Sequence, residues 1–284
     1  WRPLEQVRLA AQRAAIGRGT LRLARTLRER RASGTLAVIA EVKRVSPALG
    51  PLAEDLDPAE LAQRYQEAGA AAVSVLVEPQ HWGGSLEDLR SVERAVRRTI
   101  TYRGETLPDA LPIPVLAKDV VVDEYQIAEA GAAGAHAVLL IAEALGDDDV
   151  VRLIRAARGL GMDVLLEAHD PRDFERALRA EEATRDGDQA AGPVASGTET
   201  LLGVNARDLR EPGRIDRGRV HDLARLVPKG PVLVAESGIT SVEDAEALPM
   251  RVDAILVGTA LVRSSDPAPL VRALAAARPG RALA

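Results

Sequence analysis

Eight short apolar segments alternate with amphipathic segments along most of the chain. The apolar segments are almost continuous in Val, Leu, Ile and Ala, which is typical of strands buried on both faces of a parallel sheet. We predict that they are the strands of one repeated structural unit. In chain order they are 36–42, 71–77, 113–117, 136–141, 162–167, 200–204, 231–235 and 253–257.

A segment with the apolar spacing of a helix follows each predicted strand. Several of these segments begin beside an aspartate, as at Asp57, Asp123 and Asp170. An aspartate oxygen in this position accepts hydrogen bonds from the free backbone N–H groups of the first turn. Gly69 and Gly134 stand just before the next strand, where a helix has to stop. The predicted helices are 58–68, 85–98, 123–133, 147–159, 171–182, 215–227, 241–248 and 266–277.

Eight strand–helix units predict an α/β fold, the closed (β/α)₈ or TIM barrel. The alternative is an open doubly wound sheet, which usually carries a G-x-G-x-x-G loop after its first strand. No such loop occurs in "EVKRVSPALG" at residues 41–50. We therefore predict a single domain over residues 1–284, in which 36–284 form the barrel and 1–35 form an N-terminal helical extension.

Three segments depart from the repeat. Residues 1–31 contain nine Arg and only two Glu, which suggests either a transit peptide or a pair of amphipathic helices with a basic exposed face. The helical spacing of the apolar residues favours the helix pair. The polar stretches 99–112 and 183–199 are predicted to be surface insertions. For residues 183–199, a loop without a function is favoured over a lid.

The composition excludes several classes of function. With a net charge of −5, the chain has no general electrostatic attraction to nucleic acid or to an anionic membrane. No apolar run approaches the ~20 residues that cross a bilayer. The chain has no Cys and its four His form no i, i+4 pair, which excludes disulfides and cysteine nucleophiles and argues against a histidine metal site. We expect a cytoplasmic protein without a metal or other cofactor.

Charged and polar residues close most of the predicted strands. In this barrel the carboxyl ends of the strands meet at one mouth. A single charge there would more often form a structural ion pair, but so many are costly unless they converge on a polar ligand. We therefore predict a binding pocket at the mouth. The strand-end candidates are Glu41, Lys43, Glu78, Lys118, Glu143, Glu167, Asn205, Arg207, Glu236, Ser237, Gly238, Gly258 and Thr259.

Lysine is rare in this chain, and two of its lysines stand at strand ends. Of 37 basic residues, only Lys43, Lys118 and Lys229 are lysines. Arginine stays protonated near neutral pH, whereas a desolvated lysine can donate its proton. Period-two alternation directs Glu41 and Lys43 into the same pocket, where opposite charges shift each other's pKa. The pattern indicates proton transfer or a compact charge for a carboxylate; chance retention of two structural lysines is the alternative.

Small residues follow the last two predicted strands, in "AESGI" at 235–239 and "LVGTAL" at 256–261. Exposed backbone N–H groups after strands seven and eight of such a barrel form an anion site. A Gly-Ser pair in another loop is usually only a turn. The residues alone therefore indicate a phosphorylated, anionic small molecule and acid–base chemistry by a Lys and a Glu.

At these residues the chain resembles the indole-3-glycerol phosphate synthase family, which closes the indole ring in tryptophan biosynthesis. The resemblance extends from residue 36 to about residue 277. The ordered set of motifs is specific, whereas "VGTAL" alone is a weak signal. The matching stretches are "IAEVKRVSPALG" (39–50), "SVLVEPQHWGGSLEDL" (74–89), "PVLAKDVVVDEYQIAEAGAAGAHAVLLI" (114–141), "LLEAHD" (165–170), "LLGVNARDL" (201–209), "VAESGI" (234–239) and "ILVGTALVR" (255–263).

The resemblance implies a substrate and a role for each matching residue. The substrate is 1-(2-carboxyphenylamino)-1-deoxyribulose 5-phosphate, which a carbon–carbon lyase cyclises with loss of carbon dioxide and water. Lys118 is implied as the general acid for the substrate carbonyl, and Glu167 as the acid/base of the dehydration. Glu41 would orient the lysines, Lys43 would bind the anthranilate carboxylate and share acid duty, and Asn205 would hold a substrate hydroxyl. The implied substrate-binding residues are Ser46, Arg207, Glu236, Ser237, Gly238, Gly258 and Thr259.

Several positions depart from the family pattern. Val120 stands where an aromatic residue is usual, so a stacking contact with the anthranilate ring is missing, and Trp82, in place of a common Phe, is expected to compensate. Thr259 and Ala48 replace common Ser residues. Residues 2–12 resemble only the second half of the family's helical extension over the barrel mouth. These differences bear on affinity more than on the type of reaction.

Two other functions are weighed against this one. Phosphoribosylanthranilate isomerase is also a phosphate-binding barrel of the pathway, but it resembles this chain less because it uses a catalytic Cys, which is absent here. A non-catalytic barrel that binds the phosphate metabolite is favoured by Val120 and the short N-terminus, and disfavoured by Glu41, Lys118 and Glu167.

Two further expectations come from the resemblance. His169 matches a family position and is predicted to be structural, as the neighbour of Asp170. The expected partners are the phosphorylated substrate and other tryptophan-pathway enzymes, with no nucleic acid and no membrane, and the expected state is a monomer or weak dimer.

Overall fold

The computed structural model describes most of the chain, with gaps at both ends and within several loops. Much of the predicted insertions 99–112 and 183–199 lies outside the described residues, and so do the lid and idle-loop interpretations of the second. The described residues are 2–46, 50–52, 56–97, 101–102, 105–106, 111–185, 197–208, 211 and 213–280.

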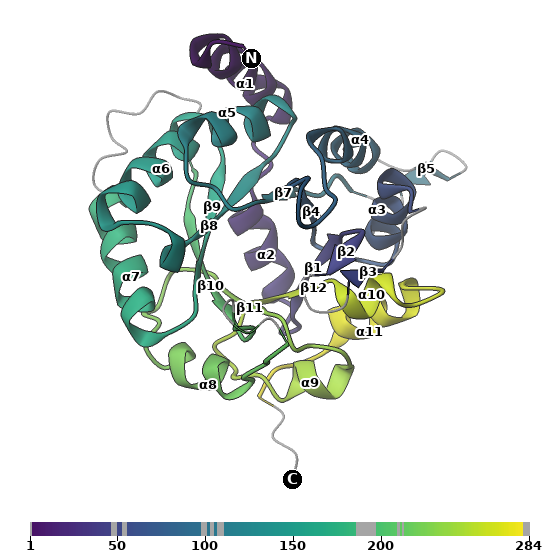
Figure 1. Cartoon of the computed structure of the whole chain (residues 1–284). Helices are drawn as coiled ribbons and strands as arrows, with labels where there is room; N and C mark the ends of the chain where they lie inside the picture. The colour runs from purple at the N-terminus through teal and green to yellow at the C-terminus, as the bar shows by residue number, and fades with distance from the viewer. Residues whose placement is uncertain are drawn as a thin grey trace.

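Eight parallel strands close into a barrel, which confirms the predicted fold (Figure 1). Each strand pairs with the strand of the next unit, and the last pairs with the first through Ala37 opposite Ala254. The observed bounds nearly coincide with the predicted apolar segments. The barrel strands are β1 (Ala37–Val42), β4 (Ala72–Leu76), β7 (Val115–Lys118), β8 (Ala137–Ile141), β9 (Asp163–Ala168), β10 (Thr200–Asn205), β11 (Leu233–Glu236) and β12 (Ala254–Val257).

Helices surround the barrel, and the eight predicted ones begin within three residues of the expected positions. A short helix at Thr259–Val262 was not among them. The Asp57 side chain accepts hydrogen bonds from the N–H groups of Ala59 and Glu60, and Asp123 forms a capping box with Gln126. The outer helices are α3 (Pro58–Glu67), α4 (Leu86–Val96), α5 (Glu124–Ala132), α6 (Asp147–Gly159), α7 (Pro171–Arg185), α8 (Gly218–Ala224), α9 (Val242–Glu246), α10 (Thr259–Val262) and α11 (Ala268–Ala276).

Short elements were not foreseen in the loops. In the loop after β1, β2 (Val45–Ser46) pairs with β3 (Gly50–Pro51). Inside the first predicted insertion, β5 (Thr101–Tyr102) pairs with β6 (Glu105–Thr106). A 3₁₀ turn, η2 (Ala142–Ala144), follows β8. Helix α7 also continues past the predicted residue 182.

The N-terminal residues form two helices, α1 (Leu4–Arg18) and α2 (Leu23–Arg31), so the helix-pair interpretation is confirmed. Helix α1 packs along α5, and α2 lies across the centre of the ring of strands in Figure 1. Among the described helices, none has both the length and the hydrophobicity that a bilayer span requires.

Helix α2 forms the floor of the barrel, at the amino-terminal ends of the strands. Its Leu23 and Leu27 are fully buried and belong to the cluster of apolar side chains inside the barrel, together with Ile39, Leu116 and Leu165. The helix therefore buries its apolar side against the barrel interior.

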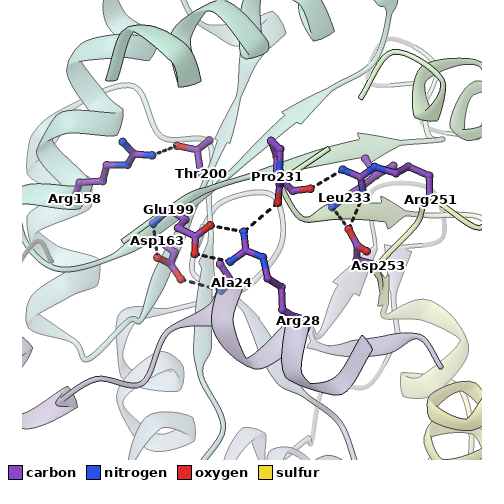
Figure 2. A network of polar contacts seen from close by, with 11 residues as sticks. Ala24, Arg28, Arg158, Asp163, Glu199, Thr200, Pro231, Leu233, Arg251 and Asp253 are labelled. Atoms are coloured by element: carbon purple, nitrogen blue, oxygen red, sulfur yellow. Dashed lines mark hydrogen bonds and ion pairs between the residues drawn. The ribbon is translucent and has the colours of Figure 1, made fainter. Parts of the chain in front are cut away.

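Polar contacts fix α2 to this floor (Figure 2). Asp163, at the start of β9, accepts one hydrogen bond from the Ala24 N–H (2.9 Å) and another from the Glu199 N–H (2.8 Å). Arg28 of α2 forms an ion pair with the Glu199 side chain. Both oxygens of a fully buried carboxylate are thus used to join the extension to the barrel.

Candidate active site

A cavity of about 350 Å³ opens at the carboxyl ends of the barrel strands. Nine of the twelve predicted site residues line it, although they come from strands far apart in the sequence. Of the other three, Gly258 directly precedes one of the nine, Gly238 directly follows another, and the side chain of Ser46 lies outside the described residues. The nine are Glu41, Lys43, Lys118, Glu167, Asn205, Arg207, Glu236, Ser237 and Thr259.

One part of the cavity wall is apolar, and sequence reasoning found little of it. Leu139 and Ile141 alternate along β8 with period two, so both point inward. The alternation of inward-pointing and outward-pointing residues along the predicted strand 136–141 could have identified these two residues from the sequence. Trp82 and Val120, already noted as departures, also line the cavity. An apolar wall opposite a few charged groups suits an aromatic ring that carries polar substituents.

The opening motif of the barrel places an ion pair in the cavity. Glu41 is the penultimate residue of β1, and Lys43, two positions later, is the first residue after the strand. The Lys43 Nζ lies 2.6 Å from the Glu41 Oε1, and the Glu41 residue is only 3% exposed. Burial opposes ionisation of Glu41, but Lys43 and Lys118 outweigh it and lower the pKa of this carboxyl. Glu41 is therefore an anion that holds Lys43.

Gly258 leaves the space that this ion pair occupies. A Cβ at this position would lie 2.2 Å from the Glu41 Oε1 and 2.9 Å from the Lys43 Nζ. Its φ of −126° is open to other residues, so the requirement is for space and not for backbone freedom. Gly258 thus shapes the site without lining it.

Lys118 connects two buried carboxylates across the cavity. It is the last residue of β7, and its Nζ lies 3.0 Å from the Glu236 Oε2 and 3.6 Å from the Glu167 Oε2. Glu236 comes from β11, opposite β7 in the ring of eight strands, and Glu167 comes from β9, two strands away from β7. Both glutamates are 1% exposed. A single ammonium therefore faces two almost completely buried carboxylates.

The two carboxylates have opposite pKa shifts. Burial raises the pKa of Glu236 to about 8, and the Glu167 charge adds to this rise against the attraction of Lys118. Burial also acts on Glu167, but Lys118 and hydrogen bonds from His169 and Asn205 hold its pKa at about 2. Burial would lower the pKa of Lys118, yet Glu236, Glu167 and Glu41 together raise it. Near neutral pH the cluster holds a charged Lys118, an ionised Glu167 and a protonated Glu236.

Asn205 and Arg207 extend this polar ring from the end of β10. The Asn205 Oδ1 accepts a hydrogen bond from the Arg207 backbone N–H (2.9 Å), which fixes the turn after the strand. The Arg207 backbone forms an isolated bridge to Ile215. Both side chains line the cavity, so the turn presents an amide and a guanidinium to a bound molecule.

The loop after β11 has the backbone conformation expected for close approach to an anion. Ser237 has φ 65° and Gly238 has φ 76°, and Ser237 is the one described non-glycine residue with a positive φ. Such a conformation costs free energy in a non-glycine residue and is common at functional sites. Ser237 lines the cavity together with Thr259. A phosphate contact at these loops remains a prediction.

Two of the predicted strand-end glutamates, Glu78 and Glu143, do not line the cavity. The Glu78 carboxylate accepts backbone hydrogen bonds from Gln80, His81 and Trp82 and so organises its own loop. Glu143 lies near His169, and the His169 Nε2 is 3.2 Å from the Glu167 Oε1. His169, predicted to be structural, therefore contacts a site carboxylate.

Solved structures share this fold at low sequence identity. The 3-hexulose-6-phosphate synthase from Salmonella typhimurium matches with a TM-score of 0.59 and 16% identity, covering 84% of this chain and 97% of that chain. The tryptophan synthase alpha chain from Legionella pneumophila matches with a TM-score of 0.59 and 15% identity, covering 91% of this chain and 97% of that chain. These similarities show the barrel fold alone.

Sequence comparison is more specific. The indole-3-glycerol phosphate synthase of Nocardioides sp. is 46% identical over 248 residues, which cover 85% of this chain and 80% of that protein. The indole-3-glycerol phosphate synthase of Carboxydothermus hydrogenoformans is 37% identical over 275 residues, which cover 96% and 92%. The family model named "Indole-3-glycerol phosphate synthase" matches residues 3–274. The chain belongs to the indole-3-glycerol phosphate synthase family.

Proposed function

We propose that this chain closes the indole ring of its substrate with Lys118 as the general acid and Glu167 as its acid/base partner. The activity is that of an indole-3-glycerol phosphate synthase, a carboxy-lyase that converts 1-(2-carboxyphenylamino)-1-deoxyribulose 5-phosphate into indole-3-glycerol phosphate, carbon dioxide and water. The observation that supports these roles best is the Lys118 ammonium between two buried carboxylates in the mouth of the barrel.

The first step forms a carbon–carbon bond. The ring carbon that carries the carboxylate attacks the substrate carbonyl carbon, and the carbonyl oxygen takes a proton from the Lys118 ammonium. The raised pKa of Lys118 keeps this ammonium charged until the oxygen becomes basic. A positive charge that the protein holds in place stabilises the developing oxyanion more strongly than a charge in bulk water would.

The later steps release carbon dioxide and water. Loss of CO₂ returns its bonding electron pair to the ring and restores aromaticity. The new hydroxyl group then leaves as water after it gains a proton, and an adjacent C–H proton is removed. Glu167 and Glu236 supply one ionised and one protonated carboxyl for these two transfers.

The remaining candidates are assigned to binding. Lys43, held by Glu41, supports a contact with the anthranilate carboxylate. Ser237, Gly238, Gly258 and Thr259 are proposed for the phosphate group, and Ser46, Asn205 and Arg207 for the other polar contacts of the substrate, which Glu236 also contacts as a proton donor. The cytoplasmic location, the contact with other tryptophan-pathway enzymes, and the monomeric or weakly dimeric state belong to the same proposal and rest on the family resemblance.

The test is an assay of the purified chain with this substrate, followed by indole fluorescence. We expect product from the wild-type chain and a loss of kcat of at least about 100-fold in Lys118→Ala, the usual scale for a general acid. Lys229→Ala, at an exposed lysine, is the matched control and should keep the wild-type rate.

The outcomes separate the alternatives. Substrate binding without product would support the non-catalytic barrel and overturn the enzyme. An active chain in which Lys118→Ala equals the wild type would leave the activity in place and remove Lys118 from the mechanism.

A further inference from the structure

His169 stands behind Glu167, on the side away from Lys118. It directly follows β9 and is 6% exposed. Its Nε2 lies 3.2 Å from one oxygen of Glu167, the Oε1, whereas the Lys118 Nζ approaches the other oxygen, the Oε2. The Glu167 carboxylate therefore connects the reacting side of the cavity with an imidazole outside it.

The second nitrogen of His169 faces another carboxylate. The His169 Nδ1 lies 3.8 Å from the Glu143 Oε2. Within the described part of the chain neither ring nitrogen has a partner with full hydrogen-bond geometry, so the imidazole has a carboxylate near each nitrogen and a fully formed hydrogen bond to neither. The Glu143 side chain is 26% exposed, so it has access to bulk water. A small rotation of Glu143 would shorten the contact to a hydrogen bond.

The backbone that carries Glu143 is held firmly. Arg176 of α7 donates hydrogen bonds to the carbonyl oxygens of Ala142 (3.0 Å) and Leu145 (2.5 Å), on either side of η2. The same guanidinium is paired with Asp173. Glu143 is thus kept beside His169 by contacts that its own side chain does not make.

The chemistry requires a proton from outside. The proposed reaction starts from a carboxylate anion and releases neutral CO₂, so its products carry one negative charge less than its substrate and each turnover takes up one proton. While the substrate fills the mouth, water in the cavity is excluded from Glu167. A route to Glu167 that avoids the mouth would supply this proton.

We propose that Glu143 and His169 form a proton-delivery path from bulk water to Glu167. This inference rests on the proposed function. Each turnover takes one proton from Lys118 and one from Glu236, and it returns one, from the substrate C–H, to Glu167, which passes it to Lys118. The second proton comes along the path: Glu143 takes it from water and gives it to the His169 Nδ1, the Nε2–H proton moves to the Glu167 carboxylate, and Lys118 carries it on to Glu236. Ring tautomerisation then restores the Nε2–H. In this path His169 and Glu143 do not touch the substrate; they act on the reaction only through Glu167. The described contacts place Glu167 and Glu143 on either side of the imidazole, with Lys118 and Glu236 beyond Glu167.

The competing role for His169 is purely structural, namely to orient Glu167. The variants separate the two roles. His169→Gln keeps a hydrogen-bond donor for Glu167 but cannot take up a proton, and His169→Ala removes both functions. Glu143→Gln removes the outer acid at a partly exposed position where folding is not at risk. His221→Gln and Glu182→Gln make the same chemical changes at exposed positions on α8 and α7.

The experiment measures kcat and KM from about pH 6 to about pH 9, with circular dichroism to check folding. We expect Glu143→Gln and His169→Gln to match the wild type at the acid end and to lose about tenfold in kcat at the alkaline end, where protons are scarce, with KM unchanged. We expect added imidazole to restore part of the rate of His169→Ala. The two control variants should follow the wild-type profile.

The outcomes are distinct. If the wild-type chain forms no indole-3-glycerol phosphate, both the proposed function and the proton path are overturned. If the wild type is active and Glu143→Gln retains its full pH profile, the path alone is overturned. A wild-type profile in His169→Gln would assign His169 to orientation and likewise overturn the path.

Discussion

Strand β9 carries one buried carboxylate near each end of the barrel, and the two have different surroundings. Asp163, at the floor, accepts a backbone hydrogen bond on each of its oxygens. Glu167, at the mouth, faces two side chains, Lys118 on one oxygen and His169 on the other. Both residues are almost completely buried and both point into the barrel.

The pKa values of the two groups shift in opposite directions because their partners differ. Burial raises the pKa of Asp163 to about 6, because neutral N–H groups only partly offset the lost hydration. The pKa of Glu167 is held at about 2, because a full positive charge overcomes its burial. The floor uses its carboxylate to fix a helix, whereas the mouth keeps an ionised carboxylate next to a proton donor. One strand can thus serve stability at one end and chemistry at the other.

The largest expected effect is on the floor. Asp163→Ala leaves the N–H groups of Ala24 and Glu199 without their acceptor, and we expect the free energy of unfolding to fall by about 3 kcal/mol because each buried donor costs about 1–3 kcal/mol. Urea denaturation measures the loss. Under conditions where the variant is folded, kcat should equal that of the wild type, because Asp163 lies at the end away from the cavity.

Asp222→Ala is the control for this change. Asp222 lies exposed on α8, and its replacement should alter the free energy of unfolding by less than about 0.5 kcal/mol. If Asp163→Ala were as stable as Asp222→Ala, or lost activity while still folded, the assignment of the floor to stability alone would be wrong.

The next effect concerns the pH dependence of stability at the mouth. Because the pKa of Glu236 is raised to about 8, the folded chain keeps a proton that the unfolded chain releases near its ordinary pKa of about 4.3. Between these two values the folded state binds more protons, so the free energy of unfolding falls as the pH rises through this window. Glu236→Gln removes this loss, and above about pH 8 we expect the variant to be more stable than the wild type by about 2 kcal/mol.

Urea denaturation of both proteins at about pH 4.5 and about pH 9 measures this difference. Asp163 contributes a decline of the same sign in both proteins, so it cancels when the two curves are subtracted. We also expect Glu236→Gln to lose activity, since a site residue is exchanged for a more stable amide. Parallel stability curves would show that Glu236 ionises in the folded chain as it does in the unfolded chain.

Much of this architecture was predictable from local patterns. The continuous apolar runs identify the strands because both of their faces are buried, and residues such as Asp57 and Asp123 mark helix starts through their own nearby hydrogen bonds. The residues at the mouth were predictable because the carboxyl ends of all eight parallel strands lie at the same end of a closed barrel. The prediction that Glu41 and Lys43 enter the same cavity needed only their separation of two positions, because side chains two residues apart in a strand point to the same side.

The remaining features depend on contacts between distant segments. The spacing of Leu23 and Leu27 shows that α2 buries one side, but not that the side fits the floor. Nothing in the sequence joins His169 to Glu143, which lie on neighbouring loops only after β8 and β9 pair. The opposite pKa shifts of Glu167 and Glu236 likewise depend on which oxygen each neighbour approaches.

The smallest expected effect is at Gly258, where a single methyl group sharpens the contrast between the two ends. In Gly258→Ala the new Cβ would lie 2.2 Å from the Glu41 Oε1, so the Glu41–Lys43 pair has to move. We expect kcat/KM to fall by about tenfold, because displacements of this size at a site are costly, and the free energy of unfolding to change little. Gly159→Ala, at the end of α6 with no atom within 4 Å of its Cβ, is the matched control and should keep the wild-type kcat/KM. Equal kcat/KM values in the two variants would mean that the Glu41–Lys43 geometry is not critical for catalysis, and the mouth would then tolerate a shift in its charges as readily as a solvent-exposed helix end tolerates a methyl group.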